Sequence, residues 1–508
     1  DVRGYMSRAA IIGAGFGGIA AALRLRAKGY DVTIFDRCSR LGGRAQVFER
    51  DGFRYDAGPT VITAPFLFEE LFSLFGKDIE NYVDIVPLNV WYRFHYADGT
   101  TFDYGGSLED TLQEIRRISP DDETGYLSLL EVSRRIYEIG YEQLADQPFH
   151  AFSDMVKIAP HMLNLGVHRS VWDLVASHLK NDKLRQAFSV QPLLVGGNPF
   201  DTTCIYNLIH FLERAHGVHF AMGGTGALVD GLSKLMAEEG INIRLEETIT
   251  HLKTENSKIT KVELESGEAF DCDLVVSNAD PVHLYTNLLP HADINLSAKI
   301  KAKHAKKSMA LFVLFFGTDT KYPDVEHHTI WLGPRYKSLL HDIFNRKVLA
   351  DDFSLYLHRP TANDPSFAPE GCDSFYALVP VPNLQGNIDW QTQGSALRDR
   401  VVKALQETIL PNLTDHLVHD FWMTPEDFAQ NYLSPAGAGF SIAPSFTQSA
   451  WFRFHNKAEG PKNLYLVGAG THPGAGLPGV ISSAKVLEHL IEPAVGQARE
   501  ICHMQAAE

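Results

Sequence analysis

The sequence predicts an α/β protein with α+β insertions, and three observations carry this prediction. A strand, a glycine-rich turn and a helix follow one another over residues 9–28, and again over residues 463–490. Residues 107–214 space charged positions among apolar ones and are divided by prolines, which is typical of several helices. At 508 residues, the chain exceeds what one hydrophobic core usually organises. We therefore expect three parts: a discontinuous domain of residues 6–106, 221–290 and 458–495, a helical insertion of residues 107–220, and a mixed α/β domain of residues 291–457.

The discontinuous domain opens with a compact βαβ unit. Ala9–Ile12 is a short apolar strand, and the glycines that follow it form a turn. Ile19–Lys28 is rich in alanine and leucine and is expected to be a helix capped by Gly29. Val32–Phe35 is expected to be the second strand. This arrangement is typical of a Rossmann-like fold.

The other expected elements are short apolar or β-branched runs bounded by turn residues. Further strands are expected at Phe53–Tyr55, Trp91–Tyr96, Ile241–Arg244, Thr248–Leu252, Asp273–Ser277, Ala310–Phe316, Ser354–His358, Phe375–Val379 and Asn463–Val467. Asp98-Gly99 and Ser266-Gly267 indicate hairpin turns, and helices are expected at Gly223–Met236 and Val480–Leu490. The most apolar run, Met309–Phe316, has eight residues. A membrane span needs about 20, so this run predicts a buried strand.

The first glycine turn is the motif that carries chemistry. Gly13 permits a tight turn, Gly15 lets a pyrophosphate approach the backbone, and Gly18 allows close packing of helix against strand. The N-terminus of the helix offers free N–H groups and a partial positive charge to phosphates. Asp36 follows Gly18 by 18 residues, where an acidic side chain binds ribose hydroxyls. These residues predict a dinucleotide site, without separating FAD from NAD.

A second motif separates the two cofactors. Leu41-Gly42-Gly43-Arg44 follows Asp36 and Arg37 by a few residues. Two glycines let the chain fold back over a cofactor, and Arg44 can pair with a phosphate. At other positions in proteins, the tripeptide Gly-Gly-Arg is commonly a surface turn. At this spacing the chain resembles the FAD-dependent amine oxidase and phytoene desaturase superfamily, which favours FAD.

Two longer stretches, Tyr55–Thr60 and Asn463–Val480, together resemble one family: the bacterial-type phytoene desaturases of carotenoid biosynthesis. The same resemblance is carried by Leu193–Phe200, Gly223–Leu228, Ser277–Asp280 and Thr447–Phe452. It runs from Ala9 to Leu490, nearly the whole chain. The resemblance implies an FAD-dependent oxidoreductase, with a Rossmann-like FAD-binding domain and a mixed-sheet substrate domain. Such an enzyme dehydrogenates phytoene stepwise toward lycopene by hydride transfer to flavin N5.

The resemblance also implies which residues hold FAD. The residues of the pyrophosphate loop would be Gly13, Gly15, Phe16, Gly17 and Gly18, and the ribose and phosphates would contact Asp36, Arg37, Gly42, Gly43 and Arg44. The adenine would contact Ile249 and Ala279. The ribityl chain and the flavin ring would contact Gly58, Pro59, Thr60, Gly470, Thr471, Gly479, Val480 and Ile481. Many related flavoproteins carry an acidic residue directly after a glycine in the last motif. Here Ala469 follows Gly468, as is usual for the desaturase branch. No carboxylate is therefore expected on the ribityl group at that position.

Desaturation asks for a long apolar tunnel that holds a polyene and excludes water, rather than for a polar triad. A base or a trapped water must still take a proton. Asp154 is the candidate base, with Lys157 one turn on as its partner. The alternative for Asp154 is a helix N-terminal cap or a solvated face. His327-His328 has no companion at metal-ligand spacing, so no metal site is expected.

Partners and compartment follow from charge, cysteines and the resemblance. The net charge of -16 argues against a nucleic-acid partner, and five scattered cysteines without a CxxC suit a reduced cytoplasmic chain. No signal peptide is expected, and Met6 resembles a natural start, so residues 1–5 are left out of the expected fold. A carotenoid dissolves only in membrane, so the resemblance implies peripheral attachment to a lipid surface. Quinone or oxygen would be the electron acceptor.

Two features are candidates for that attachment. Five lysines between Lys299 and Lys307 suit anionic lipid, and the helical insertion is rich in apolar residues from Met155 to Val175. A solvated helix face and packing inside the domain are the commoner explanations of the two patterns. The helical insertion is therefore expected to contact either substrate or membrane.

Two other kinds of function stay open. A relative with the same fold would act on another polyene, as a C30 diapophytoene desaturase, a later-step carotenoid desaturase or a carotenoid isomerase. The prenyl-protein escort proteins share the fold but are binding modules without flavin chemistry. They are expected to lack a complete phosphate turn, whereas Gly13–Gly18 and Arg44 are intact here.

Overall fold

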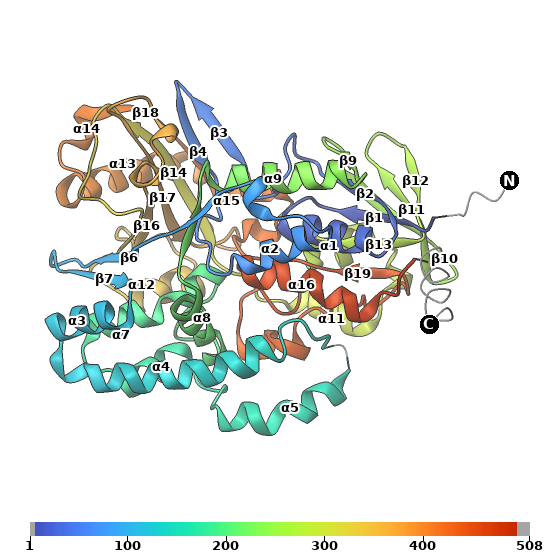
Figure 1. The fold of residues 1–508 in the computed structure, drawn as a ribbon, viewed down its shortest axis with the longest axis horizontal. Coiled ribbons are helices and arrows are strands. Elements are labelled where there is room, and N and C mark those ends of the chain that lie inside the picture. The colour runs from blue at the N-terminus through green and yellow to red at the C-terminus, as the bar shows by residue number, and fades with distance from the viewer. Residues whose placement is uncertain (1–5, 150, 495–508) are drawn as a thin grey trace.

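The computed structural model describes residues 6–149 and 151–494, and its centre is a five-stranded parallel sheet (Figure 1). The strand order is β19-β13-β1-β2-β9. The strands are β1 (Arg8–Ile12), β2 (Asp31–Phe35), β9 (Asn242–Arg244), β13 (Leu274–Ser277) and β19 (Leu464–Leu466). They come from the three separated segments that the sequence assigns to one domain. Their continuous apolar runs suit a parallel sheet, which is buried on both faces.

Alternate residues of β1 pack on opposite sides of this sheet. Ala9 and Ile11 belong to a core shared with α1 (Phe16–Ala27), α9 (Gly224–Glu238) and α16 (Leu477–Leu490). Ala10 and Ile12 belong to a second core, under a three-stranded antiparallel sheet. That sheet comprises β10 (Ile249–Glu255), β11 (Lys258–Leu264) and β12 (Ala269–Asp271). Because both faces of the parallel sheet are covered, a ligand can reach the glycine turn after β1 only from the carboxyl ends of the strands.

A buried arginine ties the helices of the first core together. Arg24 on α1 is 2% exposed and forms ion pairs with Glu488 on α16 at 2.5 Å and with Glu70 at 3.6 Å. Glu70 lies on α2 (Phe66–Ser73), which runs beside α1 and α16 in Figure 1. The amino- and carboxyl-terminal strand–turn–helix units therefore pack side by side.

The second large sheet has seven strands in the order β18-β14-β17-β16-β15-β6-β7. Its strands are β6 (Val90–His95), β7 (Thr101–Gly105), β14 (Ala310–Thr318), β15 (His328–Trp331), β16 (Leu355–His358), β17 (Asp373–Val381) and β18 (Leu417–Met423). All neighbours are antiparallel except β15 and β6, which are parallel. The buried strand expected at 309–316 is confirmed as β14, every residue of which is buried. The discontinuous domain is expected from the sequence to include all of residues 6–106. Two strands of that range, β6 and β7, belong instead to this seven-stranded sheet.

The helical insertion consists of short helices, in the lower part of Figure 1. They are α3 (Leu108–Ile118), α4 (Glu123–Tyr137), α5 (Phe152–Asn164), α6 (Val171–His178), α7 (Asp182–Ser189) and α8 (Leu208–His216). The first begins where Ser107 and Asp110 form a reciprocal capping box. Helix α5 lies at the edge of the molecule and has no fully buried residue. Among the described residues, no helix combines the length and the apolar character that crossing a membrane requires.

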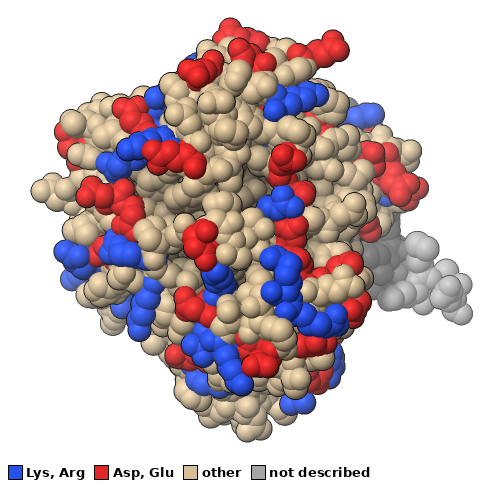
Figure 2. Space-filling view, turned by 90° about the vertical axis from the view of Figure 1, so that its left-hand side faces the viewer, with Lys and Arg blue, Asp and Glu red and all other residues tan. Residues whose placement is uncertain are grey.

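The remaining elements connect the two sheets. The short strands pair as hairpin β3 (Val47–Arg50) with β4 (Phe53–Asp56), and as β5 (Ile85–Pro87) with β8 (His219–Ala221). The other helices are α10 (Pro281–His283), α11 (Leu296–His304), α12 (Lys337–His341), α13 (Trp390–Thr408), α14 (Leu413–His416) and α15 (Pro425–Tyr432). Figure 2 shows acidic and basic side chains interleaved over the face that carries α3, α13 and α14, as on an ordinary solvated surface. The four described cysteines are free thiols.

Candidate active site

A cavity of about 630 Å³ opens at the carboxyl ends of the parallel strands, where the helical insertion and both large sheets meet. Ile12 at the end of β1, Asp36 after β2 and Asn278 after β13 all line it. In α/β sheets, this edge is where ligands bind. The cavity has a polar end at the glycine turns and a long apolar end under the helical insertion.

Glycines in the turn at the polar end are packed too closely against their neighbours to carry a side chain. A Cβ on Gly17 would lie 2.6 Å from Oδ1 of Asn278, and a Cβ on Gly18 would lie 1.8 Å from the carbonyl oxygen of Gly13. Gly13 itself has φ +90°, which favours glycine. The N-terminus of α1 follows at once, with Gly15 as its N-cap and no side-chain hydrogen bond capping it. The turn therefore offers bare N–H groups to an anion such as a diphosphate.

Asp36 stands beside this turn and is 8% exposed. Its Oδ2 accepts the N–H of Ala14 at 2.6 Å, and its Oδ1 accepts the N–H of Cys38 at 2.8 Å. Burial raises the pKa of Asp36, and the two backbone donors oppose that shift. Each carboxylate oxygen keeps acceptor capacity toward the cavity, so the side chain fits a pair of ribose hydroxyls. Arg37 also lines the cavity and donates to the carbonyl of Gln430 at 2.7 Å.

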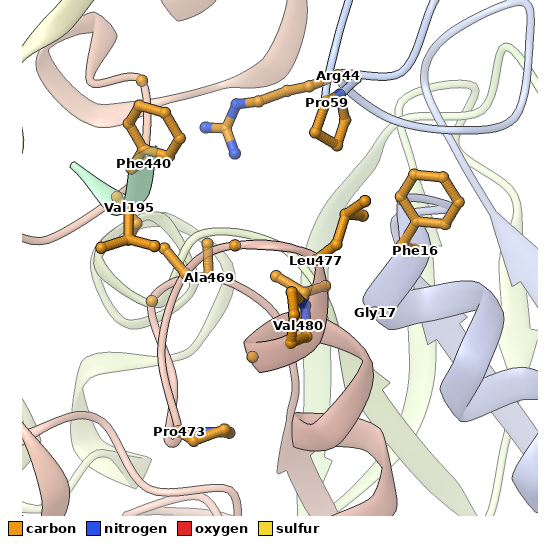
Figure 3. A pocket seen from close by; sticks show the side chains of 18 of the residues that line it. Phe16, Gly17, Arg44, Pro59, Val195, Phe440, Ala469, Pro473, Leu477 and Val480 are labelled. Carbon is orange, nitrogen blue, oxygen red and sulfur yellow. The ribbon is translucent and has the colours of Figure 1, made fainter. Parts of the chain in front are cut away.

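Arg44 is a cation at the cavity wall whose guanidinium is only partly satisfied. Its Nη2 donates to Oγ of Ser434 at 3.2 Å, and its Nε is buried without a partner. Burial lowers the pKa of Arg44 and the charge of Asp280 opposes this shift, but no carboxylate of the described residues lies within ion-pair distance of the guanidinium. Figure 3 shows the side chain reaching into the cavity between Pro59 and Phe440. A phosphate would supply the missing acceptor and the missing negative charge.

The carboxyl-terminal motif is held from behind by an arginine that the sequence analysis did not single out. Arg453 is fully buried and donates to the carbonyls of Ala469, Thr471 and Gln448 at 2.5, 3.2 and 3.1 Å. Burial lowers its pKa, and its donors are spent on the backbone. Arg453 therefore shapes the loop rather than facing a ligand. The sequence offered one clue, since Arg453 directly follows the quoted stretch Thr447–Phe452.

Asp56 joins two of the quoted stretches into one unit. Its carboxylate accepts the N–H groups of Thr225 at 2.8 Å and Gly226 at 3.2 Å, at the start of α9. The hydroxyl of Thr225 donates to the carbonyl of Pro59 at 2.8 Å. Burial raises the pKa of Asp56 to about 6. This contact presents the turn Gly58–Thr60 to the cavity.

Hydroxyl groups gather where Thr60 meets the seven-stranded sheet. Its Oγ1 lies 2.5 Å from the hydroxyl of Tyr376 and 3.1 Å from that of Tyr356, and all three side chains line the cavity. The Tyr356 hydroxyl also contacts Nδ1 of His328 and lies 3.1 Å from Nδ1 of His358. Burial lowers the pKa values of both histidines well below the ordinary value, so both rings are neutral.

These contacts correct one expectation. His327-His328 does have a companion at metal-ligand distance, because His358 stands opposite His328 in the β15–β16 pair. Burial lowers the pKa of His327 to about 4. The sequence separates His358 from the pair by thirty positions, so no local spacing indicates the cluster.

The other end of the cavity is apolar. It is lined from the helical insertion and from the seven-stranded sheet by Met155, Ile158, Met162, Leu163, Leu193, Leu194, Val195, Ile205, Leu208, Ile209, Leu212, Leu311 and Val313. Leu163 is 62% exposed and Phe446 is 40% exposed, although both line the cavity. The cavity therefore opens to the outside beside α5. This end suits a long hydrocarbon.

The two candidate catalytic residues lie outside the lining. Oδ2 of Asp154 accepts the N–H of Ala151 at 3.3 Å, which caps the start of α5. Lys157 is exposed on the same helix. His472 lines the cavity, but its Nε2 contacts the carbonyl of Leu144 at 3.2 Å, and burial lowers its pKa to about 4.

The structure brings most of the expected cofactor residues to this one cavity. Those that line it are Gly13, Gly15, Phe16, Gly17, Asp36, Arg37, Gly42, Gly43, Arg44, Gly58, Pro59, Thr60, Ile249, Ala279, Gly470, Gly479 and Val480. Gly18, Thr471 and Ile481 lie behind the lining. Asn278 lines the cavity as well and was not among the expected contacts.

Comparison with known proteins gives a consistent family. The sequence model of the family of flavin containing amine oxidoreductases matches residues 16–486. A lycopene-forming phytoene desaturase of Pantoea ananas is 46% identical over 487 residues, covering 96% of this chain and 99% of that protein. A 4,4'-diapophytoene desaturase (4,4'-diapolycopene-forming) of Methylomonas sp is 32% identical, covering 95% and 94%. An oxidoreductase from Methanosarcina mazei shares the fold alone, with a TM-score of 0.66 at 16% identity over 95% of this chain and 100% of that one.

Proposed function

The chain belongs to the flavin-containing amine oxidoreductases and, within them, to the bacterial-type phytoene desaturases, and we propose that it dehydrogenates phytoene stepwise toward lycopene with FAD as its redox cofactor. The observation that carries this proposal is the cavity, whose glycine-lined end continues into a long apolar end. When bound, FAD supplies a hydride acceptor at N5 of its ring. The chain's own residues have to bind the cofactor, align the hydrocarbon and exclude water.

The polar end fits FAD in detail. The uncapped N–H groups at the start of α1 and the unsatisfied Nε of Arg44 would hold the diphosphate, and Asp36 would hold the adenosine ribose. Gly58, Pro59 and Thr60 would lie toward the flavin ring, opposite Gly479 and Val480. These groups come from both ends of the chain, so the folded domain is required for binding.

The apolar end supports a hydrocarbon substrate. Its lining carries no charged side chain from α5 or α8, so a polyene that enters would remove no charged group of these helices from water. Each buried CH₂ group contributes about 0.8 kcal/mol, which favours a long chain over a short one. The greater identity to the phytoene desaturase than to the diapophytoene desaturase favours a C40 substrate over a C30 one. The 46% identity to an enzyme over 96% of this chain argues against the alternative of a prenyl-protein escort protein without flavin chemistry.

The experiment that tests this function offers C40 phytoene and C30 diapophytoene, each in liposomes, to the purified protein with FAD. We expect stepwise red-shifted polyene spectra from phytoene, with products of increasing desaturation up to lycopene. An electron acceptor is supplied as quinone in one arm and as oxygen in the other. Activity on C30 alone, or a purified protein that takes up no FAD, would overturn the proposal.

Replacing Arg44 by glutamine tests the polar end. The variant loses a charge-assisted hydrogen bond, so its affinity for FAD should fall by about 1.5–3 kcal/mol, roughly ten- to a hundredfold. Titration of the apoprotein with FAD, followed by fluorescence, measures this. Arg40 is exposed a few residues away, so R40Q is the matched control and should bind FAD normally. Equal affinity in R44Q would remove Arg44 from the binding residues.

The catalytic role of Asp154 and Lys157 stays a hypothesis, and one substitution tests it. Because Asp154 caps α5, we expect D154N to lose about 0.5–1 kcal/mol of stability and to keep a kcat near the wild-type value. A base in the reaction would instead cost about 100-fold or more in kcat. Rates and melting temperatures of D154N and K157M, measured side by side, distinguish the two roles.

We further propose that α5 docks the protein on a lipid surface. Its outer residues Phe152 and Val156 are 59% and 55% exposed, whereas its inner residues line the cavity. Phe152 packs against Trp451 at 5.3 Å between ring centroids, and Nζ of Lys301 lies 5.9 Å from the same tryptophan ring. Lys301 itself forms an ion pair with Glu459 at 3.1 Å, so the exposed apolar residues of α5 are the surface that adjoins the open end of the cavity. A carotenoid would pass from lipid into the cavity there.

The docking face can be tested without touching the cavity lining. We expect F152S/V156S to weaken partition onto anionic liposomes by tenfold or more, since each side chain contributes about 1.5–3 kcal/mol when fully buried. Val348 and Val418 are also exposed, so V348S/V418S removes two exposed apolar side chains elsewhere and should partition normally. Sedimentation with vesicles gives both values. Unchanged partition of F152S/V156S would move the contact to another surface.

A further inference from the structure

Three buried histidines stand together behind the cavity wall. His328 begins β15, directly opposite His358 at the end of β16, and His327 precedes them. One ring nitrogen of each side chain lies within 4.8 Å of one from each of the others. The three side chains are 2%, 0% and 1% exposed for His327, His328 and His358. None of them lines the cavity.

One nitrogen of each ring is oriented by a neighbour. Nδ1 of His327 lies 2.7 Å from Oδ1 of Asn363, an oxygen that only accepts, so this nitrogen carries the proton. Nδ1 of His358 and Nδ1 of His328 both contact the hydroxyl of Tyr356. That hydroxyl reaches Oγ1 of Thr60 at 3.1 Å, so it can donate there and accept from both rings. Outer partners of this kind orient the histidines of metal sites.

The other nitrogen of each ring has nothing to bind. Nε2 of His327, of His328 and of His358 is buried and has no hydrogen-bond partner. A buried polar atom left unpaired costs about 1–3 kcal/mol, and here three such atoms occur in one cluster. With the protons held at Nδ1, each Nε2 presents a lone pair. Three neutral imidazoles with free lone pairs are a ligand set for a transition metal.

We propose that His327, His328 and His358 bind one divalent transition metal ion through their Nε2 atoms, with Zn²⁺ as the first choice. Three histidines and a water form a known type of four-coordinate zinc site. Bonds of about 2.0–2.1 Å require the three nitrogens to lie about 3.3 Å apart, so the rings would draw together on binding. The group contains no carboxylate, which disfavours Mg²⁺ and Ca²⁺.

The ion would act on the cavity through Tyr356. With both rings ligated, His328 and His358 are fixed as donors, and the Tyr356 hydroxyl is fixed as a donor to Thr60. Thr60 lines the cavity in the turn that Asp56 and α9 support. The metal would thus stiffen one wall of the site and take no direct part in the reaction.

The test uses the FAD-loaded protein, free of any affinity tag, after treatment with a chelator. It is exposed to Zn²⁺ or Co²⁺, gel-filtered and analysed for metal by mass spectrometry. We expect about one ion per chain, a visible Co²⁺ spectrum typical of four-coordination, and a higher melting temperature with metal. H358Q should retain no metal, whereas H251Q, on β10 outside the cluster, should retain it.

A second variant guards against misfolding of H358Q. Y356F keeps all three ligands and removes the hydroxyl that orients two of them, so it should bind metal about 10- to 100-fold more weakly. Flavin absorbance and melting temperature without metal report the folding of each variant. A wild-type protein that retains no Zn²⁺ and no Co²⁺ overturns the proposal. So does equal metal retention by H358Q, by Y356F and by the wild type.

Discussion

Replacing Gly18 by alanine is expected to abolish stable binding of FAD. The new Cβ would lie 1.8 Å from the carbonyl oxygen of Gly13, which belongs to the backbone of the phosphate turn. No rotamer relieves this overlap, so α1 or the turn must move, and the N–H groups meant for the diphosphate move with it. We expect FAD affinity to fall by at least about a hundredfold, close to 3 kcal/mol. The ratio of flavin to protein absorbance and titration of the apoprotein measure this.

Gly231 provides a matched control for Gly18. It lies inside α9, and the nearest atom to an added Cβ is Cβ of Tyr82 at 3.3 Å. G231A should bind FAD normally and should change stability by no more than about 1 kcal/mol, because alanine is the better helix former. A yellow, fully loaded G18A would mean that the close packing of Gly18 does not set the shape of the turn.

The sequence predicted the nucleotide-binding part well because its signals are local. The strands at residues 9–12 and 32–35 lie within β1 and β2, each of which begins one residue earlier. The helix begins at Phe16 rather than at the expected Ile19. Glycines lower helix propensity, so the pattern alone favours a later start. Packing of Gly18 against Gly13 overrides that propensity.

Pairings between distant segments could not be predicted in the same way. β15 has only four residues and begins with a histidine, so no alternation of apolar residues marks it. Its neighbours are β6 and β16, which the sequence places in different parts of the chain. The histidine cluster depends on that pairing and was missed for the same reason.

In the site, residue type alone did not separate groups that face the ligand from groups that support it. Thr471 and Ile481 lie in motifs that line the cavity, but both are fully buried and neither is part of the lining. Arg453 and Asp56 bind backbone groups in the interior, and only the fold shows which carbonyls and N–H groups they meet. Asp154 satisfies the N–H of Ala151, a role that the sequence left open beside the catalytic one.

Replacing Glu213 by glutamine is expected to make stability less dependent on pH. Glu213 lies on α8 and is fully buried, with both carboxylate oxygens unpaired. Burial raises its pKa to about 8, although Tyr92 and Arg214 oppose the shift. The folded protein therefore keeps this proton up to about pH 8, whereas the unfolded chain releases it near pH 4.5. This contribution to stability is fully present below about pH 4.5 and is lost as the pH rises through about 8.

The size of this loss follows from the shift. Between pH 5 and pH 7.5 the wild-type protein should lose about 1.4 kcal/mol per pH unit at this residue, or about 3 kcal/mol in all. E213Q does not titrate there, so its stability relative to the wild type should rise by that amount over the same interval. Urea unfolding of both proteins at each pH gives the difference directly. The buried amide that E213Q introduces has unpaired donors of its own, which lower the stability of the variant by the same amount at every pH. The informative quantity is therefore the change in the stability difference with pH, not its value at one pH.

The exposed Glu80 supplies the control for this slope. E80Q removes a carboxylate that is in contact with solvent, so its stability relative to the wild type should stay flat with pH. If E213Q were equally flat, Glu213 would have to be ionised in the folded protein. Its charge would then need a partner close to Tyr92 and Arg214, outside the cavity lining. A slope in E213Q alone would instead identify a neutral carboxylic acid held inside the helical insertion at neutral pH.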